Sequence, residues 1–392
     1  MENRRLTSYR VLEEVFDKGA SLKDAYKRAT QGKTARESDF IKEMTYGVTR
    51  KKLLLDWYFV KAVNKEMTNV SKKSKHLIRM AIYEIVFMKH KDYAVLSSIV
   101  DIAKENLRNQ DKFVNWALRE FLRNYEKVSL PDSNDKQSLS HLYSFPQHLV
   151  EYLISEVGTE RAVQLMQFYN EKPDYYAFNI ETGEYREFST DERLSSKEYL
   201  LDPVYLNIFR FLQLEKVSTV LDCCAAPGGK SFLLKSFVKD AKITAIDKDS
   251  RRVDTMKKNI ERLDLKDIKT SAVDILASDL NKVFDLVILD VPCTATGTIR
   301  KNPDVKYNYR KKLETLPSLQ YSMLEKADEY VKEDGFMLYM TCSILNQENY
   351  AVVSDFVAKN GDYKVYSQFF SFGMPFNGGY GVLLRKSGGK DV

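Results

Sequence analysis

Residues 220–231 read Val220-Leu-Asp-Cys-Cys-Ala-Ala-Pro-Gly-Gly-Lys-Ser231. The apolar start predicts the end of a β-strand, and the Pro-Gly-Gly sequence predicts a tight turn that opens a helix. Glycine at such a turn lets the backbone approach a ligand closely, and the helix N-terminus offers that ligand free N–H donors. Because the glycines fit neither G-x-G-x-x-G nor the Walker A spacing, we expect a cofactor site of a different class.

Strands and helices alternate in the sequence from about residue 218 onward. Continuous apolar stretches such as Phe284-Asp-Leu-Val-Ile-Leu289 are typical of a parallel sheet that is covered on both faces. We therefore expect an α/β domain in the second half of the chain. Its expected strands are 218–222, 242–247, 268–273, 283–289, 335–341, 364–369 and 380–385, and its expected helices are 229–239, 249–263, 312–332 and 346–359.

An aspartate follows each of the first four expected strands of this domain. They are Asp222, Asp247, Asp274 and Asp290. A carboxylate at the end of the second strand can accept hydrogen bonds from ribose hydroxyls, and ligands of open α/β sheets bind outside the carboxyl ends of the strands. A single such aspartate would more simply be a helix N-cap. Four in register around a Pro-Gly-Gly turn favour a ligand site.

The N-terminal third of the chain is predicted to be helical and basic. Residues 1–139 hold 28 Lys and Arg against 19 Asp and Glu, whereas the remaining residues hold 33 against 36. Such asymmetry suggests a polyanionic partner, although a Lys-rich solvated surface would give the same count. Apolar periodicity and the first proline at Pro131 predict an all-α bundle, followed by a polar linker over 129–140. The expected helices are 4–18, 21–29, 36–63, 73–88, 93–108 and 111–125, with two more within 146–170 and a β-like stretch at 175–180.

Composition excludes several other classes of protein. The chain of 392 residues is 44% apolar and 30% charged, a globular balance. Its start lacks the apolar segment of a signal peptide, and the uncharged run 365–384 contains Pro375 and four glycines, so we reject it as a membrane helix. Four cysteines without CxxC spacing predict neither a disulfide framework nor a zinc site. We expect a reduced, cytoplasmic protein that binds no metal and no membrane.

Two cysteines follow strands at the expected ligand edge. Cys293 lies in Leu289-Asp-Val-Pro-Cys-Thr-Ala-Thr-Gly-Thr-Ile-Arg300, and Cys342 lies in Tyr339-Met-Thr-Cys-Ser343. A lone cysteine is more often an inert packing residue. A thiolate, however, is a strong nucleophile, and its addition to C6 of a cytosine would make C5 able to attack a sulfonium methyl group. A base must then remove the C5 proton before the thiolate can leave, and a second thiol could assist that stage.

These motifs resemble those of the RNA cytosine-5 methyltransferases. The stretch Cys293-Thr-Ala-Thr-Gly-Thr-Ile-Arg-Lys-Asn-Pro-Asp304 is similar to the RsmB (Sun/Fmu) family, which acts on 16S ribosomal RNA. The helical region resembles the NusB-like domain of that family through Tyr46-Gly-Val-Thr-Arg50, Arg79-Met-Ala-Ile-Tyr83 and Phe113-Val-Asn-Trp-Ala-Leu-Arg119. The resemblance implies a NusB-like RNA-binding bundle over 1–130, linker helices with a reduced small subdomain over 131–200, and a seven-stranded Rossmann-like methyltransferase domain over 201–392.

The same resemblance implies a role for each site residue. Asp247 would hold the ribose of S-adenosylmethionine and Asp274 the adenine edge, while Asp290 would lie near the methionine moiety and the target base. Cys342 would be the nucleophile, and Cys293 would aid product release. The implied partner is 16S ribosomal RNA or a small-subunit assembly intermediate, and we expect a monomer. The segment against the cofactor would comprise Cys224, Ala225, Ala226, Pro227, Gly228, Gly229 and Lys230.

Other functions remain open at this point. A DNA cytosine-5 methyltransferase would use the Pro-Cys thiol as nucleophile, but it would need a Glu-Asn-Val type motif that the sequence lacks. Another RNA, such as transfer RNA, is possible because the motifs report chemistry and not substrate. A NusB-like adaptor beside an inactive domain is a third reading. The basic run 300–312, with Tyr307 and Tyr309, predicts RNA contact in a groove beside the active site, against the alternative of a solvated loop.

Overall fold

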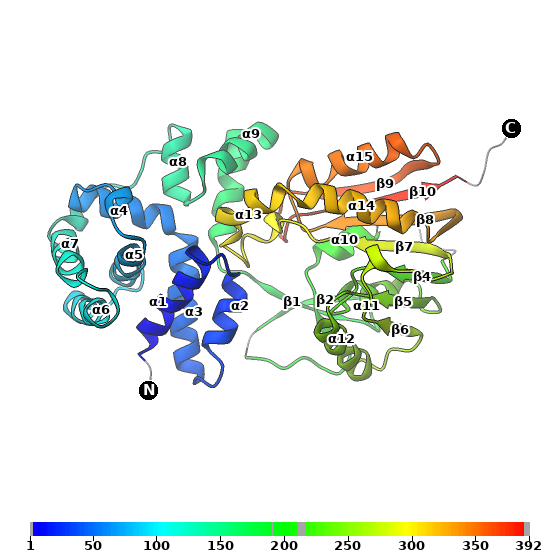
Figure 1. The fold of residues 1–392 in the computed structure, drawn as a ribbon, viewed down its shortest axis with the longest axis horizontal. Coiled ribbons are helices and arrows are strands. Elements are labelled where there is room, and N and C mark those ends of the chain that lie inside the picture. Colours follow the sequence, from blue (N-terminus) through cyan, green and yellow to red (C-terminus); the bar gives the residue numbers. More distant parts are fainter. Residues whose placement is uncertain (1–2, 190, 211–216, 388–392) are drawn as a thin grey trace. The chain divides into compact units, whose positions relative to one another are not determined.

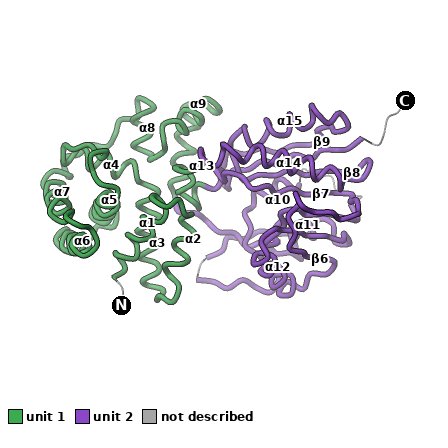
Figure 2. Tube along the Cα trace, viewed as in Figure 1, with its two compact units in different colours: residues 1–171, 299–308 green, residues 172–298, 309–392 purple. Residues whose placement is uncertain are grey.

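The computed structural model describes residues 3–189, 191–210 and 217–387 (Figure 1). The chain divides into two compact units, coloured separately in Figure 2. Unit 1 comprises Met1–Glu171 and Ile299–Asn308, and unit 2 comprises Lys172–Thr298 and Tyr309–Val392. The short segment Ile299–Asn308, which overlaps the end of the Cys293 motif, therefore belongs to the helical unit.

Unit 1 is built from α-helices. They are α1 (Arg4–Phe16), α2 (Leu22–Ala29), α3 (Ala35–Arg50), α4 (Lys52–Val63), α5 (Lys72–Val86), α6 (Asp92–Asn106), α7 (Asp111–Asn124), α8 (Lys136–Tyr143) and α9 (Gln147–Asn170). Polar side chains start several of them: the Ser21 and Ser71 hydroxyls accept backbone N–H bonds, and Thr34 forms a reciprocal capping box with Glu37. The predicted all-helical bundle is confirmed.

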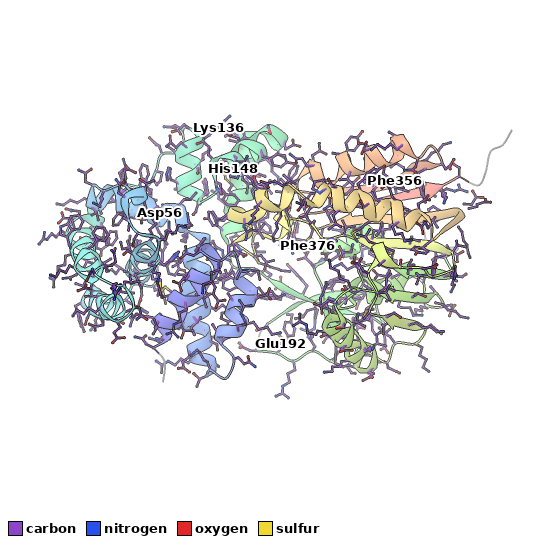
Figure 3. The ribbon with its side chains drawn as sticks, viewed as in Figure 1. Asp56, Lys136, His148, Glu192, Phe356 and Phe376 are labelled. Atoms are coloured by element: carbon purple, nitrogen blue, oxygen red, sulfur yellow. The ribbon has the colours of Figure 1, made fainter. Side chains whose placement is uncertain are left out.

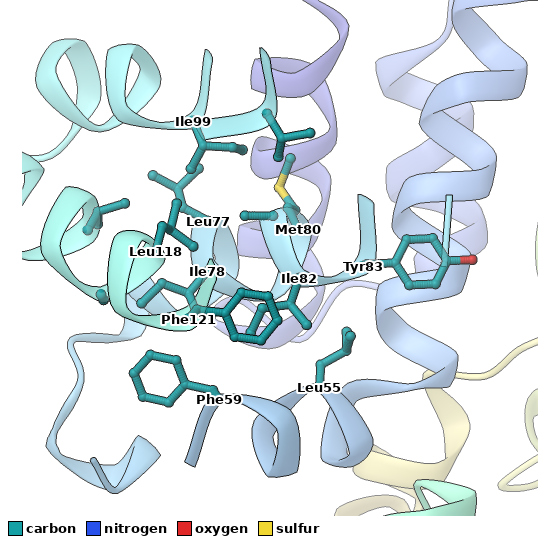
Figure 4. Close-up of a cluster of buried hydrophobic side chains, with 14 of the residues drawn as sticks. Leu55, Phe59, Leu77, Ile78, Met80, Ile82, Tyr83, Ile99, Leu118 and Phe121 are labelled. Atoms are coloured by element: carbon teal, nitrogen blue, oxygen red, sulfur yellow. The ribbon is translucent and has the colours of Figure 1, made fainter. Parts of the chain in front are cut away.

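The core of unit 1 surrounds α5, whose residues from Leu77 to Ile85 are all buried. Figure 4 shows the packing of Leu77, Ile78, Met80 and Ile82 from this helix with side chains from its neighbours. Those neighbours contribute Leu55, Phe59, Ile99, Leu118 and Phe121. Burying a large apolar side chain stabilises the fold by about 1.5–3 kcal/mol, so a helix with so few exposed positions organises the whole bundle.

Two boundaries in unit 1 differ from the prediction. The single helix expected over 36–63 is two helices, because Lys51 leaves the helical region at φ −108° and ψ 16°. Neither Gly nor Pro marks this break, so apolar periodicity could not reveal it. The linker expected over 129–140 is also too long: α8 begins at Lys136, where the Asp135 carboxylate accepts bonds from the backbone of Gln137 and Ser138. That polar cluster includes a helix cap.

Unit 2 contains a seven-stranded sheet in the order β6-β5-β4-β7-β8-β10-β9. All its pairings are parallel except those of β10, which is antiparallel to both β8 and β9. The predicted seven-stranded Rossmann-like fold is confirmed, and the uncharged run 365–384 forms most of β9 and β10. The strands are β4 (Thr219–Asp222), β5 (Lys242–Ile246), β6 (Ile268–Ser271), β7 (Phe284–Asp290), β8 (Val331–Thr341), β9 (Tyr363–Ser371) and β10 (Gly379–Lys386).

Helices cover both faces of this sheet, as continuous apolar strands predict. Val220 belongs to the core on one face and the next residue, Leu221, to the core on the other. Helices α10 (Val204–Arg210), α11 (Gly229–Phe237) and α12 (Ser250–Arg262) contribute to the first core. Helices α14 (Leu316–Asp328) and α15 (Tyr350–Lys359) contribute to the second, where Phe356 lies fully buried (Figure 3).

Two further features depart from the predicted elements. The expected helix 312–332 is replaced by α13 (Val305–Leu313) and α14, which starts with Pro317 in its first turn. Helix α10 has no counterpart among the predicted elements. The β-like stretch expected over 175–180 is confirmed as β1 (Tyr175–Asn179). It forms an antiparallel sheet with β2 (Tyr185–Phe188) and β3 (Glu198–Leu200), which were not predicted.

Across the described part of the chain, no helix combines the length and apolarity needed to cross a bilayer.

Candidate active site

The sheet order reverses between β4 and β7, and a cavity of about 270 Å³ opens at the carboxyl ends of the strands there. Strand ends, the loops after them and helix α14 all contribute to its walls. The lining residues are Tyr205, Cys223, Cys224, Lys230, Asp247, Lys248, Arg252, Asp274, Ile275, Leu276, Asp290, Val291, Pro292, Cys293, Leu319, Met323 and Cys342. Sequence reasoning identified seven of these positions as site residues.

The glycine-rich turn joins β4 to α11 beside this cavity. The backbone N–H of Ala225 donates to the Ile246 carbonyl at 3.0 Å, which fixes the turn to β5. Gly228 has φ 114°, and a Cβ there would lie 2.1 Å from the Phe232 ring, so no other residue fits without displacement. Cys224 and Lys230 at the two ends of the turn line the cavity. The intervening Ala225, Ala226, Pro227, Gly228 and Gly229 shape the turn without lining it.

Asp222 is the one strand-end aspartate that does not face the cavity. It is fully buried, and the Ser231 hydroxyl donates to its Oδ2 at 2.6 Å, which joins the end of β4 to α11. Burial raises the pKa of Asp222 to about 7, well above the usual value of a carboxyl. The expectation that all four aspartates share a ligand site is therefore wrong for Asp222, whose role is to hold the turn.

Asp247 follows β5 and is held by the backbone on both sides. Its Oδ1 accepts from the N–H of Asp249 at 3.0 Å and its Oδ2 from that of Ala226 at 3.2 Å. Arg252 lies 3.4 Å from Oδ2 and also donates to the Ala226 carbonyl. This arrangement fixes the carboxylate at the cavity wall. Sequence reasoning missed Arg252 because its position on α12 carries no motif.

Asp274 caps a short 3-10 turn, Ile275–Ala277, through a 3.1 Å bond from the N–H of Leu276. It nevertheless lines the cavity together with Ile275 and Leu276. Capping and ligand binding are thus compatible for this residue, since the second carboxylate oxygen is not used by the cap. Apolar side chains beside a carboxylate suit a flat, partly polar ring system.

Lys230 and Asp290 form an ion pair inside the cavity, with Nζ 2.5 Å from Oδ2. The Lys230 ammonium also lies over the Tyr205 ring, 4.3 Å from its centroid. Burial alone would lower the pKa of Lys230, but the Asp290 carboxylate outweighs that effect and the pKa is raised well above its ordinary value. The cavity therefore holds a permanent cation next to a carboxylate. Tyr205 comes from α10, a helix that the sequence did not predict.

The two cysteines of the predicted motifs meet at the cavity, with their Sγ atoms 3.3 Å apart and both free. Cys293 follows β7 and Cys342 follows β8, adjacent parallel strands. The hydrogen bond to Cys342, together with burial, raises the pKa of Cys293 well above the ordinary value of a thiol. The raised pKa favours the protonated form of Cys293, whose S–H group can donate to the Cys342 sulfur.

Hydrogen bonds hold the loops that carry these cysteines together. The N–H of Gly297 donates to the Cys342 carbonyl at 2.9 Å, and the hydroxyls of Thr296 and Ser343 are 3.0 Å apart. Glu348, which is fully buried, accepts from the Thr294 N–H at 2.8 Å and from Gln320 at 3.2 Å. Sequence reasoning did not identify Glu348, because its partners come from two other elements.

We expect Gly297→Ala to destabilise this arrangement. The added Cβ would lie 2.2 Å from the Gly378 carbonyl oxygen and 2.9 Å from that of Cys342, so backbone must move. Overpacking of this kind lowers the free energy of unfolding by about 1–3 kcal/mol. Each kcal/mol lowers Tm by roughly 2–4 °C in a domain of this size. Calorimetry should show a lowered Tm for this variant and an unchanged one for Gly361→Ala, where nothing lies within 4 Å of the new Cβ. Equal Tm values would contradict the argument.

The basic run 300–312, predicted to contact RNA in a groove beside the active site, is mostly packed inside the protein. Lys306 is fully buried in unit 1, where its Nζ donates to the Arg50 carbonyl at 2.9 Å and lies over the Phe145 ring. The Tyr307 hydroxyl bonds to Ser144 at 3.2 Å, so its ring is packed and not free to stack on a base. A lysine can be buried when backbone acceptors satisfy its ammonium group, which a charge pattern does not reveal. Only residues 310–312 at the end of the run are exposed.

Within the described residues, no group of three or more His, Cys, Asp and Glu side chains is arranged to hold a metal ion.

Comparison with known proteins gives consistent matches for both parts of the chain. Residues 209–377 match the family described as 16S rRNA methyltransferase RsmB/F, and residues 2–123 match the NusB family. Ribosomal RNA small subunit methyltransferase B of Erwinia tasmaniensis is 26% identical over 397 residues, covering 92% of this chain and 91% of the relative. The protein of the same name from Shewanella oneidensis is 28% identical over 401 residues, covering 93% and 91%.

Solved structures agree on the fold. The crystal structure of PH0851 has a TM-score of 0.76 at 21% identity and covers 97% of this chain and 99% of its own. The structure of NSun6 from Pyrococcus horikoshii with SFG has a TM-score of 0.54 at 18% identity, covering 62% of this chain and 99% of its own. The first of these likenesses extends over both units.

Proposed function

We propose that this protein methylates C5 of a cytosine in 16S ribosomal RNA, with S-adenosylmethionine as methyl donor. In support, residues 209–377 match the family described as 16S rRNA methyltransferase RsmB/F, and residues 2–123 match the NusB family. The single observation that carries the proposal is the pair of free thiols 3.3 Å apart at a cavity walled by three carboxylates. C5 of cytosine is not nucleophilic enough to take a methyl group directly, so its methylation needs covalent activation. One thiol of the pair would be the nucleophile, and the other would assist its release.

The cavity residues fit S-adenosylmethionine. Asp247, already oriented by two backbone N–H groups, would accept from the ribose hydroxyls. Asp274, with Ile275 and Leu276 beside it, would border the adenine, and Asp290 would lie near the methionine moiety. The bound cofactor supplies an electrophilic methyl group on a sulfonium. The protein's part is to fix this group against the target base and to keep water from it.

Cys342 is proposed to act as nucleophile. Its thiolate would add to C6 of the cytosine, forming an S–C6 bond and moving the C5–C6 π electrons to C5. C5 would then take the methyl group from the sulfonium, whose sulfur would keep the electron pair of the broken S–CH3 bond and become a thioether. A base removes the C5 proton, C5=C6 re-forms and the S–C6 bond breaks. Cys293, kept protonated by its raised pKa, can donate a hydrogen bond to the departing sulfur.

The Lys230–Asp290 pair is proposed to orient the target base. Cytosine presents an amino group and ring acceptors on one edge, and a paired ammonium and carboxylate offer the complementary donor and acceptor. Since Asp290 starts the loop that ends in Cys293, the same segment would place both the base and the second thiol.

Substrate identity is tested by labelling. Purified protein with tritiated S-adenosylmethionine should methylate 16S ribosomal RNA, and bisulfite sequencing of small-subunit RNA from a deletion strain should lose one non-converted cytosine. If only transfer RNA were labelled, the substrate would be transfer RNA and not 16S ribosomal RNA. Absence of any labelling by a protein that binds the cofactor would favour the adaptor reading.

Asp247→Ala should weaken S-adenosylmethionine binding by about one to two decades. A hydrogen bond to a charged acceptor is worth roughly 1.5–3 kcal/mol, and 1.4 kcal/mol corresponds to a factor of ten. Calorimetric titration of the variant measures this loss directly. The matched control is Asp254→Ala, which removes an exposed aspartate on α12 that lies 3.6 Å from Lys257. A folded Asp247→Ala protein with the affinity of the control would remove Asp247 from the cofactor site.

The thiol pair also bears on where the protein can work. Two free sulfurs 3.3 Å apart are close enough to form a disulfide with small adjustments, and oxidation would remove the proposed nucleophile. We therefore propose a reducing compartment such as the cytoplasm.

A further inference from the structure

The solvent-facing side of α7 carries four exposed residues: Lys112, Trp116, Arg119 and Arg123. They are spaced four, three and four apart, which places them along one face of the helix. We call this face the α7 surface. The opposite side of α7 is buried in the core of unit 1 through Val114, Ala117, Leu118 and Phe121.

Trp116 is the unusual member of this surface. Its side chain is 48% exposed, although α7 already buries a full apolar face without it. The ring lies 5.8 Å from that of Phe113, which in turn lies under the ammonium of Lys65. An exposed aromatic among cations is typical of a binding surface and not of a solvated helix, because a polar residue would serve solubility better.

The charges around Trp116 are largely uncompensated. In the described structure Lys112 has no carboxylate partner, and Arg119 donates to the amide oxygen of Asn115 at 3.0 Å. Only Arg123 is paired, with Glu120 at 3.0 Å and both groups accessible to solvent. Such exposed ion pairs contribute little to stability, so Arg123 can readily exchange the Glu120 carboxylate for another anion.

The neighbouring helix α6 also exposes an aromatic side chain, Tyr93 at 71%, but its exposed charges differ in sign. Its exposed charged residues are Asp101, Lys104 and Glu105, of mixed sign, and Lys104 lies 3.9 Å from Asp101. The stripe of three exposed cations around an exposed tryptophan therefore distinguishes α7 from α6.

We propose that the α7 surface is a second RNA-binding site, separate from the catalytic cavity, which takes a single-stranded segment of the substrate RNA. Lys112, Arg119 and Arg123 would contact successive phosphates, and Trp116 would stack on an unpaired base. A paired base offers no free face for such stacking, which is why the proposal specifies a single strand. The inference rests on the proposed function only in taking RNA as the substrate.

The experiment uses point variants of the full chain. Removing residues 1–130 would be a poor test, since Lys306 takes its backbone acceptor from Arg50 and would lose it. The variants are Trp116→Ala and the triple change Lys112→Gln, Arg119→Gln, Arg123→Gln. Lys104→Gln on α6 is the matched control for charge, and Trp57→Phe removes the other of the two tryptophans so that fluorescence reports Trp116 alone.

The probe is a single-stranded fragment of 16S ribosomal RNA, with the same sequence as a duplex for comparison. We expect Trp116→Ala to raise Kd for the single strand about tenfold, and Trp116 fluorescence in the Trp57→Phe protein to be quenched by it. The triple variant should reduce the slope of log affinity against log salt by about two, at roughly 0.7 per phosphate contact. S-adenosylmethionine affinity and the Lys104→Gln protein should be unchanged.

Folded α7 variants with the RNA affinity and salt slope of the unchanged protein would overturn the inference, as would equal effects on the duplex and the single strand. Unquenched Trp116 fluorescence would also overturn it and would turn attention to a protein partner for this surface. These results differ from failure of the proposed function, in which the unchanged protein itself would neither bind nor methylate RNA.

Discussion

Cys342→Ala is expected to abolish methyl transfer to RNA while leaving S-adenosylmethionine affinity nearly intact. Without a thiolate at this position C6 receives no nucleophile, C5 stays too electron-poor to take the methyl group, and the loss should be roughly a thousandfold or more. The cofactor contacts are proposed for Asp247, Asp274 and Asp290, which the substitution does not touch. Tritium incorporation into 16S ribosomal RNA measures the first outcome, and calorimetry measures the second.

Cys342→Ser separates nucleophilicity from size. The hydroxyl fills nearly the same space beside Cys293 but does not ionise near neutral pH, so this variant should be as inactive as the alanine one. Substantial activity in either variant would exclude Cys342 as the nucleophile. A covalent adduct of RNA with Cys342→Ala would reverse the assignment, because Cys293 would then be the attacking thiol. A DNA cytosine-5 methyltransferase uses the cysteine of its Pro-Cys motif in this way.

Local sequence sufficed for the sheet and for much of the site. The buried residues of the strand 284–289 are apolar on both faces of the sheet. This pattern occurs where helices cover a parallel sheet on each side. Because parallel strands end at one edge, residues that directly follow them converge there whatever the rest of the chain does. Asp247, Asp274, Asp290, Cys293 and Cys342 could therefore be predicted to share a site before any contact was known, and all five line the cavity.

The direction of a side chain at a strand end could not be predicted in this way. Asp222 occupies the same kind of position as the other aspartates but points to Ser231 inside the protein. Tyr205, Arg252 and Glu348 come to the site or its support through packing of elements that are distant in the sequence or unmarked by any motif.

Charge patterns were the least reliable guide. The alternation of Lys, Arg and Tyr over 300–312 predicted a nucleic-acid groove. The Lys306 ammonium instead donates to a backbone carbonyl and lies over an aromatic ring. Sequence reasoning used Phe113–Arg119 only as a mark of the NusB-like resemblance, and it did not identify the α7 surface as a binding surface. What distinguishes the two regions is exposure, which depends on the packing of the bundle and not on the composition of the segment.

Cys293→Ala is expected to do the opposite of Cys342→Ala and accumulate a protein–RNA adduct. Attack by Cys342 and methyl transfer need no second thiol, so both should proceed. Release requires the sulfur of Cys342 to leave C6, and Cys293 lies 3.3 Å from that sulfur with its pKa raised so that it keeps its proton. Without the hydrogen bond from Cys293, the departing thiolate is less stabilised and the methylated adduct should persist.

The adduct is measured as a band that survives denaturing electrophoresis and carries both RNA and the tritiated methyl group. Cys293→Ala should show it in most of the protein after one turnover, whereas the unchanged protein should show little. The double variant Cys293→Ala, Cys342→Ala is the control and should show none, because the adduct needs the Cys342 sulfur. Rapid, complete turnover by Cys293→Ala would remove Cys293 from the release step. An adduct in the double variant would place the covalent bond on a residue other than these two cysteines, since neither thiol would remain to form it.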